Sequence, residues 1–108
     1  MSAKFVKIES SDQLDELFER SYTAPVALLK HSNSCGISSD ILEQTAEVDG
    51  VVNVVVIQEQ RPISTEIAER TGHRHQSPQA FVIKDGKPIY HATHYGISPA
   101  EMEKRLKS

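Results

Sequence analysis

The chain has 108 residues, of which 38% are hydrophobic and 25% charged, and its formal net charge is −3. This length suits one domain that buries a core without disulfides, so we predict a single domain over residues 1–108. The negative charge without a basic stripe argues against nucleic-acid binding, and the lack of a long apolar run or a secretory signal in residues 1–8 favours a cytoplasmic protein that makes no membrane contact.

The first half of the chain predicts alternating strands and helices. In chain order these are a strand over 5–8, a helix over 10–21, a strand over 26–30, a helix over 38–47 and a strand over 51–57. Ser10 and Gln13 have the spacing of a capping box, which begins the first helix. The second and third strands are continuously apolar, which is typical of parallel strands that are buried on both faces of a sheet.

The second half of the chain predicts a helix, a hairpin and a final helix. These elements are a helix over 61–71, strands over 79–84 and 87–93, and a helix that begins at 98–99. Gly72 is the expected stop of the first of these helices. Asp85 and Gly86 form a strong hairpin signal between antiparallel strands, and Pro88 favours an edge position for the last strand because proline donates no hydrogen bond.

Cys35, the only cysteine, lies between the strand over 26–30 and the next helix. Helix amides at this point have no intrahelical acceptor and the helix dipole is positive, so a thiolate is favoured there. We expect the amides of Gly36, Ile37 and Ser38, with the Ser38 hydroxyl, to stabilise it. An inert, packed thiol is the alternative. With one cysteine, any redox chemistry must be intermolecular.

Three segments, 34–38, 72–80 and 91–97, in this order and spacing resemble the YtxJ-like monothiol bacilliredoxins. The resemblance covers almost the whole chain. It implies an α/β, thioredoxin-like fold, with a central mixed sheet of about four to five strands flanked by helices.

The resemblance also implies an activity. Cys35 would remove bacillithiol from bacillithiolated proteins by thiol–disulfide exchange, with no bound cofactor and with bacillithiol as co-substrate. The expected partners are bacillithiolated proteins and a low-molecular-weight thiol. By the same resemblance, the Ser77–Pro78 bond is expected to be cis and to face Cys35. The expected substrate-binding residues are Ser34, Ser77, Pro78, His94, Tyr95 and Gly96.

The sequence departs from the thioredoxin and bacilliredoxin patterns at three positions. Gly36 follows the cysteine where the family usually has proline, which returns one backbone N–H to the loop. Leu29 stands where many thioredoxins carry a buried aspartate, which favours thiol transfer over general disulfide reduction. Ser38 replaces the resolving cysteine, so release requires a second small thiol. The five histidines do not have the spacing of a zinc site, and we predict no metal.

Two other functions compete with this hypothesis. In the first, the protein is a non-catalytic binding or adaptor module with a thioredoxin-like fold, and the cysteine has ordinary reactivity. In the second, it is a single-cysteine redox sensor or a thiol-dependent reductase of a small oxidant, which would accumulate sulfenic acid. The sequence leaves the small thiol, the protein substrates, the reducing partner and the oligomeric state open.

Overall fold

The computed structural model describes residues 2–108, so Met1, the first residue of the predicted domain, lies outside the described residues. The elements in chain order are β1 (Lys4–Lys7), α1 (Ser11–Arg20), β2 (Val26–His31), α2 (Gly36–Thr45), β3 (Val51–Val56), α3 (Arg61–Thr71), β4 (Gln79–Lys84), β5 (Lys87–Thr93), the 3-10 helix η1 (His94–Gly96) and α4 (Pro99–Leu106). No helix in this part of the chain is long and apolar enough to span a membrane.

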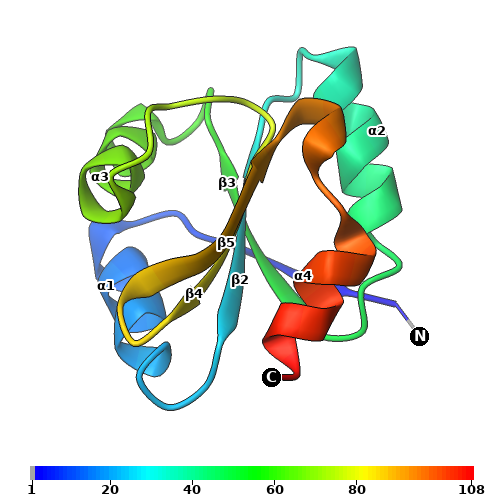
Figure 1. The fold of residues 1–108 in the computed structure, drawn as a ribbon. Helices are drawn as coiled ribbons and strands as arrows, with labels where there is room; N and C mark the ends of the chain where they lie inside the picture. Colours follow the sequence, from blue (N-terminus) through cyan, green and yellow to red (C-terminus); the bar gives the residue numbers. More distant parts are fainter. Residues whose placement is uncertain (1) are drawn as a thin grey trace.

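The strands form one mixed five-stranded sheet in the order β1-β3-β2-β4-β5. Strand β3 pairs in parallel with β1 and β2, whereas β4 pairs antiparallel with β2 and β5. Helices α1 and α3 cover one face and α2 and α4 the other (Figure 1). This arrangement confirms the predicted α/β fold with a central mixed sheet between helices.

Alternate residues of the central strands supply two apolar cores, one on each face. On β2, Ala27 and Leu29 belong to the core under α2 and α4, whereas Leu28 belongs to the core under α1 and α3. All three are fully buried. Burying one such leucine stabilises the fold by about 1.5–3 kcal/mol. The continuous apolar run in the sequence therefore reflects a strand with helices on both sides.

The helix after Cys35 differs from its predicted bounds of 38–47. It begins two residues earlier, at Gly36, and ends at Thr45. The early start follows from Cys35, which has extended dihedrals and whose carbonyl oxygen accepts the Ser39 N–H at 3.1 Å. Cys35 is therefore the N-cap residue of α2, and the first three helical residues are Gly36, Ile37 and Ser38.

The predicted caps and turns are confirmed. The Ser10 hydroxyl accepts the Gln13 N–H at 3.1 Å, and Gly72 ends α3 in the left-handed region with φ 74°. Asp85 and Gly86 both have positive φ, as the tight turn of the β4–β5 hairpin requires. Strand β5 lies at the edge of the sheet, and Pro88 faces Ile83 where the register shifts.

Candidate active site

Four segments that are far apart in the sequence meet at one edge of the sheet. The parallel strands β2 and β3 both end there, which brings the segments 32–35 and 57–60 together. Because Lys30 pairs with Gln79, and Gln79 with Thr93, β4 begins and β5 ends at the same edge. Ser77, Pro78 and η1 therefore lie at the same end of the sheet as Cys35, where open α/β sheets bind ligands.

Cys35 is partly exposed and is a free thiol. Its backbone N–H donates to Ser32 O at 3.5 Å, and its side chain makes no capping hydrogen bond to α2. The unpaired first amides of the helix, together with its dipole, favour negative charge at this position. The geometry suits a nucleophilic sulfur, and the stabilising roles of Gly36, Ile37 and Ser38 stay predictions.

The segment that precedes Cys35 is held by Gln58, which sequence reasoning missed. The Gln58 amide nitrogen donates to Ser32 Oγ at 2.7 Å and to Ser34 Oγ at 3.0 Å. Its amide oxygen accepts the Asn33 N–H at 3.2 Å. One side chain from the loop after β3 thus fixes three successive residues before the cysteine. No periodicity or motif in the sequence marks Gln58.

Ser38 lies fully inside the molecule. Its hydroxyl accepts the Ser32 N–H at 2.9 Å, so it links the first turn of α2 to the end of β2. Ser34, in contrast, is exposed. Ser32 is buried as well, and both Ser38 and Gln58 bond to it. The loop before Cys35 is therefore ordered by side chains on two sides.

The Ser77–Pro78 peptide bond is cis, as predicted. Pro78 is buried, and its carbonyl oxygen accepts the His94 N–H at 3.0 Å. This bond joins the segment before β4 to η1, and His94 takes a positive φ of 52° to make it. The Ser77 hydroxyl is buried and has no hydrogen-bond partner within the described residues.

Tyr95 extends from η1 over the first turns of α2. It is exposed, and its hydroxyl donates to Asp40 Oδ2 at 2.8 Å. This hydrogen bond to the Asp40 carboxylate raises the pKa of Tyr95, and the nearby Cys35 adds to the rise. Gly96, the last residue of η1, is also exposed. The predicted residues at 94–96 thus lie beside the cysteine helix, and Asp40 is a partner that the sequence did not indicate.

Besides His94, the chain has four histidines, at positions 31, 73, 75 and 91. The rings of His73 and His91 stack with centroids 3.8 Å apart, and His75 Nδ1 lies 3.1 Å from Ser64 Oγ. Burial lowers the pKa of His31, which ends β2. Among residues 2–108, no group of three or more His, Cys, Asp or Glu side chains could hold a metal ion.

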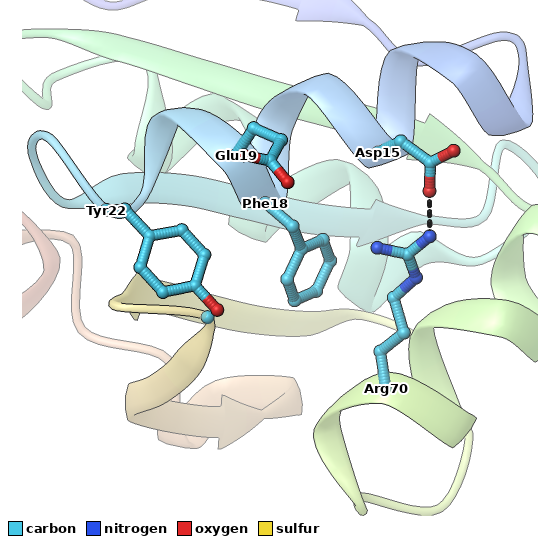
Figure 2. A pocket seen from close by; sticks show the side chains of 6 residues that line it. Asp15, Phe18, Glu19, Tyr22 and Arg70 are labelled. Carbon is cyan, nitrogen blue, oxygen red and sulfur yellow. Dashed lines mark hydrogen bonds and ion pairs between the residues drawn. The ribbon is translucent and has the colours of Figure 1, made fainter.

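A separate hollow of about 460 Å³ lies against α1, α3 and the hairpin. Figure 2 shows Arg70 reaching towards Asp15, with Phe18 beside it. The Arg70 guanidinium bonds to Asp15 and lies 4.9 Å from the Phe18 ring centroid. Gly86 also lines this hollow, and it belongs to the hairpin turn at the end of β4 that is opposite Pro78. This hollow therefore lies away from the cysteine end of the sheet.

The fold and the site together define a thioredoxin-fold protein with a single cysteine at the start of its second helix. The chain is similar to a solved structure described as a candidate oxidoreductase with a thioredoxin fold (29% identity, TM-score 0.82, covering 94% of this chain and 92% of that one). It shares its fold with the thioredoxins of Malassezia sympodialis (18% identity, TM-score 0.73, covering 96% and 89%) and Schistosoma mansoni (20%, 0.70, covering 96% and 94%).

The model of the monothiol bacilliredoxin BrxC family matches residues 6–102. The chain therefore belongs to the monothiol bacilliredoxin family. Family and fold together support a thiol redox role for the protein, in agreement with the resemblance seen in the sequence.

Proposed function

We propose that this protein is a monothiol oxidoreductase that removes bacillithiol from mixed disulfides on proteins through Cys35. The observation that carries the proposal is the position of the only cysteine, at the N-cap of α2 and at the sheet edge where Pro78 and η1 also lie. Membership of the bacilliredoxin family supports bacillithiol as the small thiol. We assign the reaction to the cytoplasm, where small thiols keep cysteines reduced.

The proposed reaction has two exchange steps. The Cys35 thiolate attacks the bacillithiol sulfur, so that a new S–S bond forms, the original S–S bond breaks, and the target cysteine leaves as a thiolate. A second bacillithiol thiolate then attacks the adduct, which releases bacillithiol disulfide and restores Cys35. Over both steps the target cysteine is reduced and one free bacillithiol is oxidised, and the two bacillithiol molecules leave joined as the disulfide. Ser38 cannot replace this second thiol because a hydroxyl is too weak a nucleophile.

The substrate would lie between the cysteine helix and the 77–78 peptide. The backbone of Ser77 would offer hydrogen bonds to a sulfur-linked ligand, while Tyr95 and Gly96 border the same end of the sheet. His94 positions this border through its bond to Pro78. Ser34, held by Gln58, lies next to the nucleophile.

The experiment is to mix a bacillithiolated model protein with the wild type and to follow the intact mass of both partners without free thiol. We expect the adduct mass to move onto the wild type and to persist until bacillithiol is added. Cys35→Ala should accept nothing, whereas the matched control Ser39→Ala, which alters an exposed residue of the same helix, should accept the adduct as the wild type does.

Three results would contradict the proposal. Equal loss of the adduct with Cys35→Ala, or no transfer to the wild type, would favour the adaptor function. Stable sulfenic acid on Cys35 after peroxide treatment, without transfer, would favour the redox sensor. A parallel reaction with a glutathionylated protein identifies the preferred small thiol.

A further inference from the structure

We propose that a small hollow beside the cysteine loop is a subsite for a carboxylate of the small thiol. The hollow has a volume of about 200 Å³ and is lined by Ile57, Arg61, Ser64, Thr65 and His75. This inference rests on the proposed function, because it names the part of the small thiol that the enzyme recognises. Bacillithiol and glutathione both carry carboxylates, so the proposal concerns a group that the two thiols share.

One cation lines the hollow and a second one bonds to a lining residue. Arg61 is in the wall and is exposed, whereas Lys30 does not line the hollow but is fully buried, with Nζ donating to the carbonyl oxygen of Ser64 at 3.2 Å. Within residues 2–108, neither side chain forms an ion pair. Buried charges in proteins are normally paired. An anion in the hollow would supply a countercharge to Arg61 and lie on the side of Ser64, to which Lys30 bonds.

The acidic residues closest in sequence to the lining residues pair with other cations. Glu59 pairs with Lys7 at 3.4 Å, and Glu66 pairs with Arg70 at 2.8 Å. The hollow therefore has positive electrostatic character although the whole chain has a net charge of −3. This local contrast favours an anionic ligand over a neutral or cationic one.

The uncharged groups of the hollow also suit an anion. Ser64 and Thr65 offer hydroxyls, and His75 Nδ1 lies 3.1 Å from Ser64 Oγ, which leaves its other ring nitrogen for a ligand. Three of the lining residues, Arg61, Ser64 and Thr65, belong to the first turns of α3, whose N-cap Gln60 makes no side-chain capping bond. Because the dipole is positive at this end of the helix, it adds to the attraction from Arg61 and Lys30.

The hollow is coupled to the active site through the backbone. Ile57 N donates to His31 O at 2.9 Å, and the next residue, Gln58, holds the segment before Cys35. On the other side, His75 lies three residues before Pro78. A ligand disulfide-linked to Cys35 would thus have its anion site at the same end of the sheet. The small volume suits one end of a small molecule better than a protein segment.

The test compares acid and ester forms of each small thiol on the same model protein. Transfer rates to the wild type are measured for bacillithiol against its malate diester and for glutathione against its glycyl ester. We expect about a tenfold preference for an acid, as one charge-assisted contact provides. Arg61→Gln should reduce the ratio of the acid rate to the ester rate to about one and leave the ester rate unchanged. The control Arg20→Gln, which removes an exposed charge at the opposite end of β2, should leave this ratio as it is in the wild type.

A second readout separates this proposal from the proposed function. The Cys35→Ser variant is titrated with S-methyl bacillithiol, and amide shifts of Thr65 and His75 are followed by NMR. We expect the acid form of the ligand, but not its ester, to move the Thr65 and His75 amide resonances. When Arg61→Gln is added to the Cys35→Ser variant, neither form should move them. The subsite would be overturned, with the reaction left intact, if acid and ester transfer at equal rates. It would also be overturned if the acid form still moves the resonances after Arg61→Gln. Shifts without any transfer would support the subsite and overturn the reaction.

Discussion

At the scale of single residues, adjacent positions on β2 have opposite environments. Leu29 is packed in the apolar core under α2 and α4, at the position where many thioredoxins carry an acid. Lys30 is equally buried, but its ammonium bonds to the Ser64 carbonyl oxygen near α3. Burial lowers the pKa of Lys30 from 10.5 to about 8. The protein therefore keeps a mostly charged amine inside at neutral pH.

Replacement of Lys30 by methionine should stabilise the protein at pH 7. The folded-state pKa of Lys30, about 8, lies below the unfolded value of 10.5. Below pH 8 the folded state therefore carries a buried charge that lowers the free energy of unfolding, and this cost disappears as the pH rises towards 10.5. The gain is at most about 3 kcal/mol, and less after solvent screening. It should be largest at or below pH 8 and shrink above it, in urea titrations. The exposed Lys84→Met is the control, and a gain independent of pH would contradict this interpretation.

Gly36 follows Cys35 at the position where the sequence resemblance leads us to expect proline. It occupies the first position of α2, a place that proline fits, and a side-chain carbon there would meet open space. Cys35 has φ −116° and ψ 122°, a conformation compatible with a following proline. The glycine therefore adds a backbone donor and chain freedom without a steric need for either.

We expect Gly36→Pro to stabilise the protein by about 0.4–1 kcal/mol, because it restricts the unfolded chain. It also removes the Gly36 N–H, so alkylation of Cys35 by iodoacetamide at neutral pH should slow. Gly36→Ala keeps the N–H and should leave the alkylation rate unchanged. The two variants are compared by thermal unfolding and by alkylation rate at one fixed pH. An equal or faster rate in the proline variant would show that this amide does not stabilise the sulfur.

At the scale of elements, the active site is assembled by loops that hold one another. Gln58, after β3, bonds to the loop after β2, while His94, after β5, bonds to Pro78 before β4. Tyr95 connects η1 to α2 through Asp40. Each link joins two different elements at the same sheet edge. The cysteine therefore lies on an ordered platform, and not on an isolated turn.

Gln58→Ala should loosen the segment before Cys35. Loss of its three hydrogen bonds should cost about 1 kcal/mol of stability, because Gln58 is exposed and water replaces part of the interaction. Amide exchange at Asn33 and Ser34 should become faster, and bacillithiol transfer should slow several-fold. Gln58→Glu keeps the acceptor for the Asn33 N–H and loses the donors, so its exchange and transfer rates should lie between those of the wild type and those of Gln58→Ala. Unchanged exchange would mean that the clamp does not order the loop.

At the scale of the whole molecule, stability comes from a sheet that is covered by helices on both faces. Phe81 lies on β4, fully buried in the core under α1 and α3. Its ring centroid lies 5.2 Å from that of His91 and 5.9 Å from that of His73. The aromatic packing thus extends from the core to the edge strand β5 and to the end of α3.

Phe81→Ala should destabilise the protein by about 3–5 kcal/mol, because it removes a large buried side chain and leaves a cavity. Phe5→Ala is the matched control, since Phe5 is 39% exposed on the edge strand β1, and it should cost less than half as much. The free energy of unfolding is measured in urea for both variants. Similar losses for the two phenylalanines would contradict the assignment of Phe81 to the central core.

The sequence by itself determined the order and type of the elements, the hairpin at Asp85–Gly86, the caps at Ser10 and Gly72 and the position of Cys35 before a helix. These features depend on patterns within a few residues, such as apolar periodicity, capping side chains and glycine dihedrals. The family resemblance further predicted the cis bond at Pro78. The local pattern missed the bounds of α2, which starts two residues earlier because Cys35 itself is the N-cap residue, and it missed the 3-10 helix η1.

The tertiary structure alone decided which distant residues meet. Gln58 lies 24 residues from Ser34, and Asp40 lies 55 residues from Tyr95, so no local pattern could pair them. The sequence also did not show which face of the sheet each β2 side chain occupies. The run is continuously apolar because both faces are buried, so it has no period-two alternation. Strand register therefore decided that Lys30 faces Ser64, and that a cationic hollow lies beside the cysteine loop.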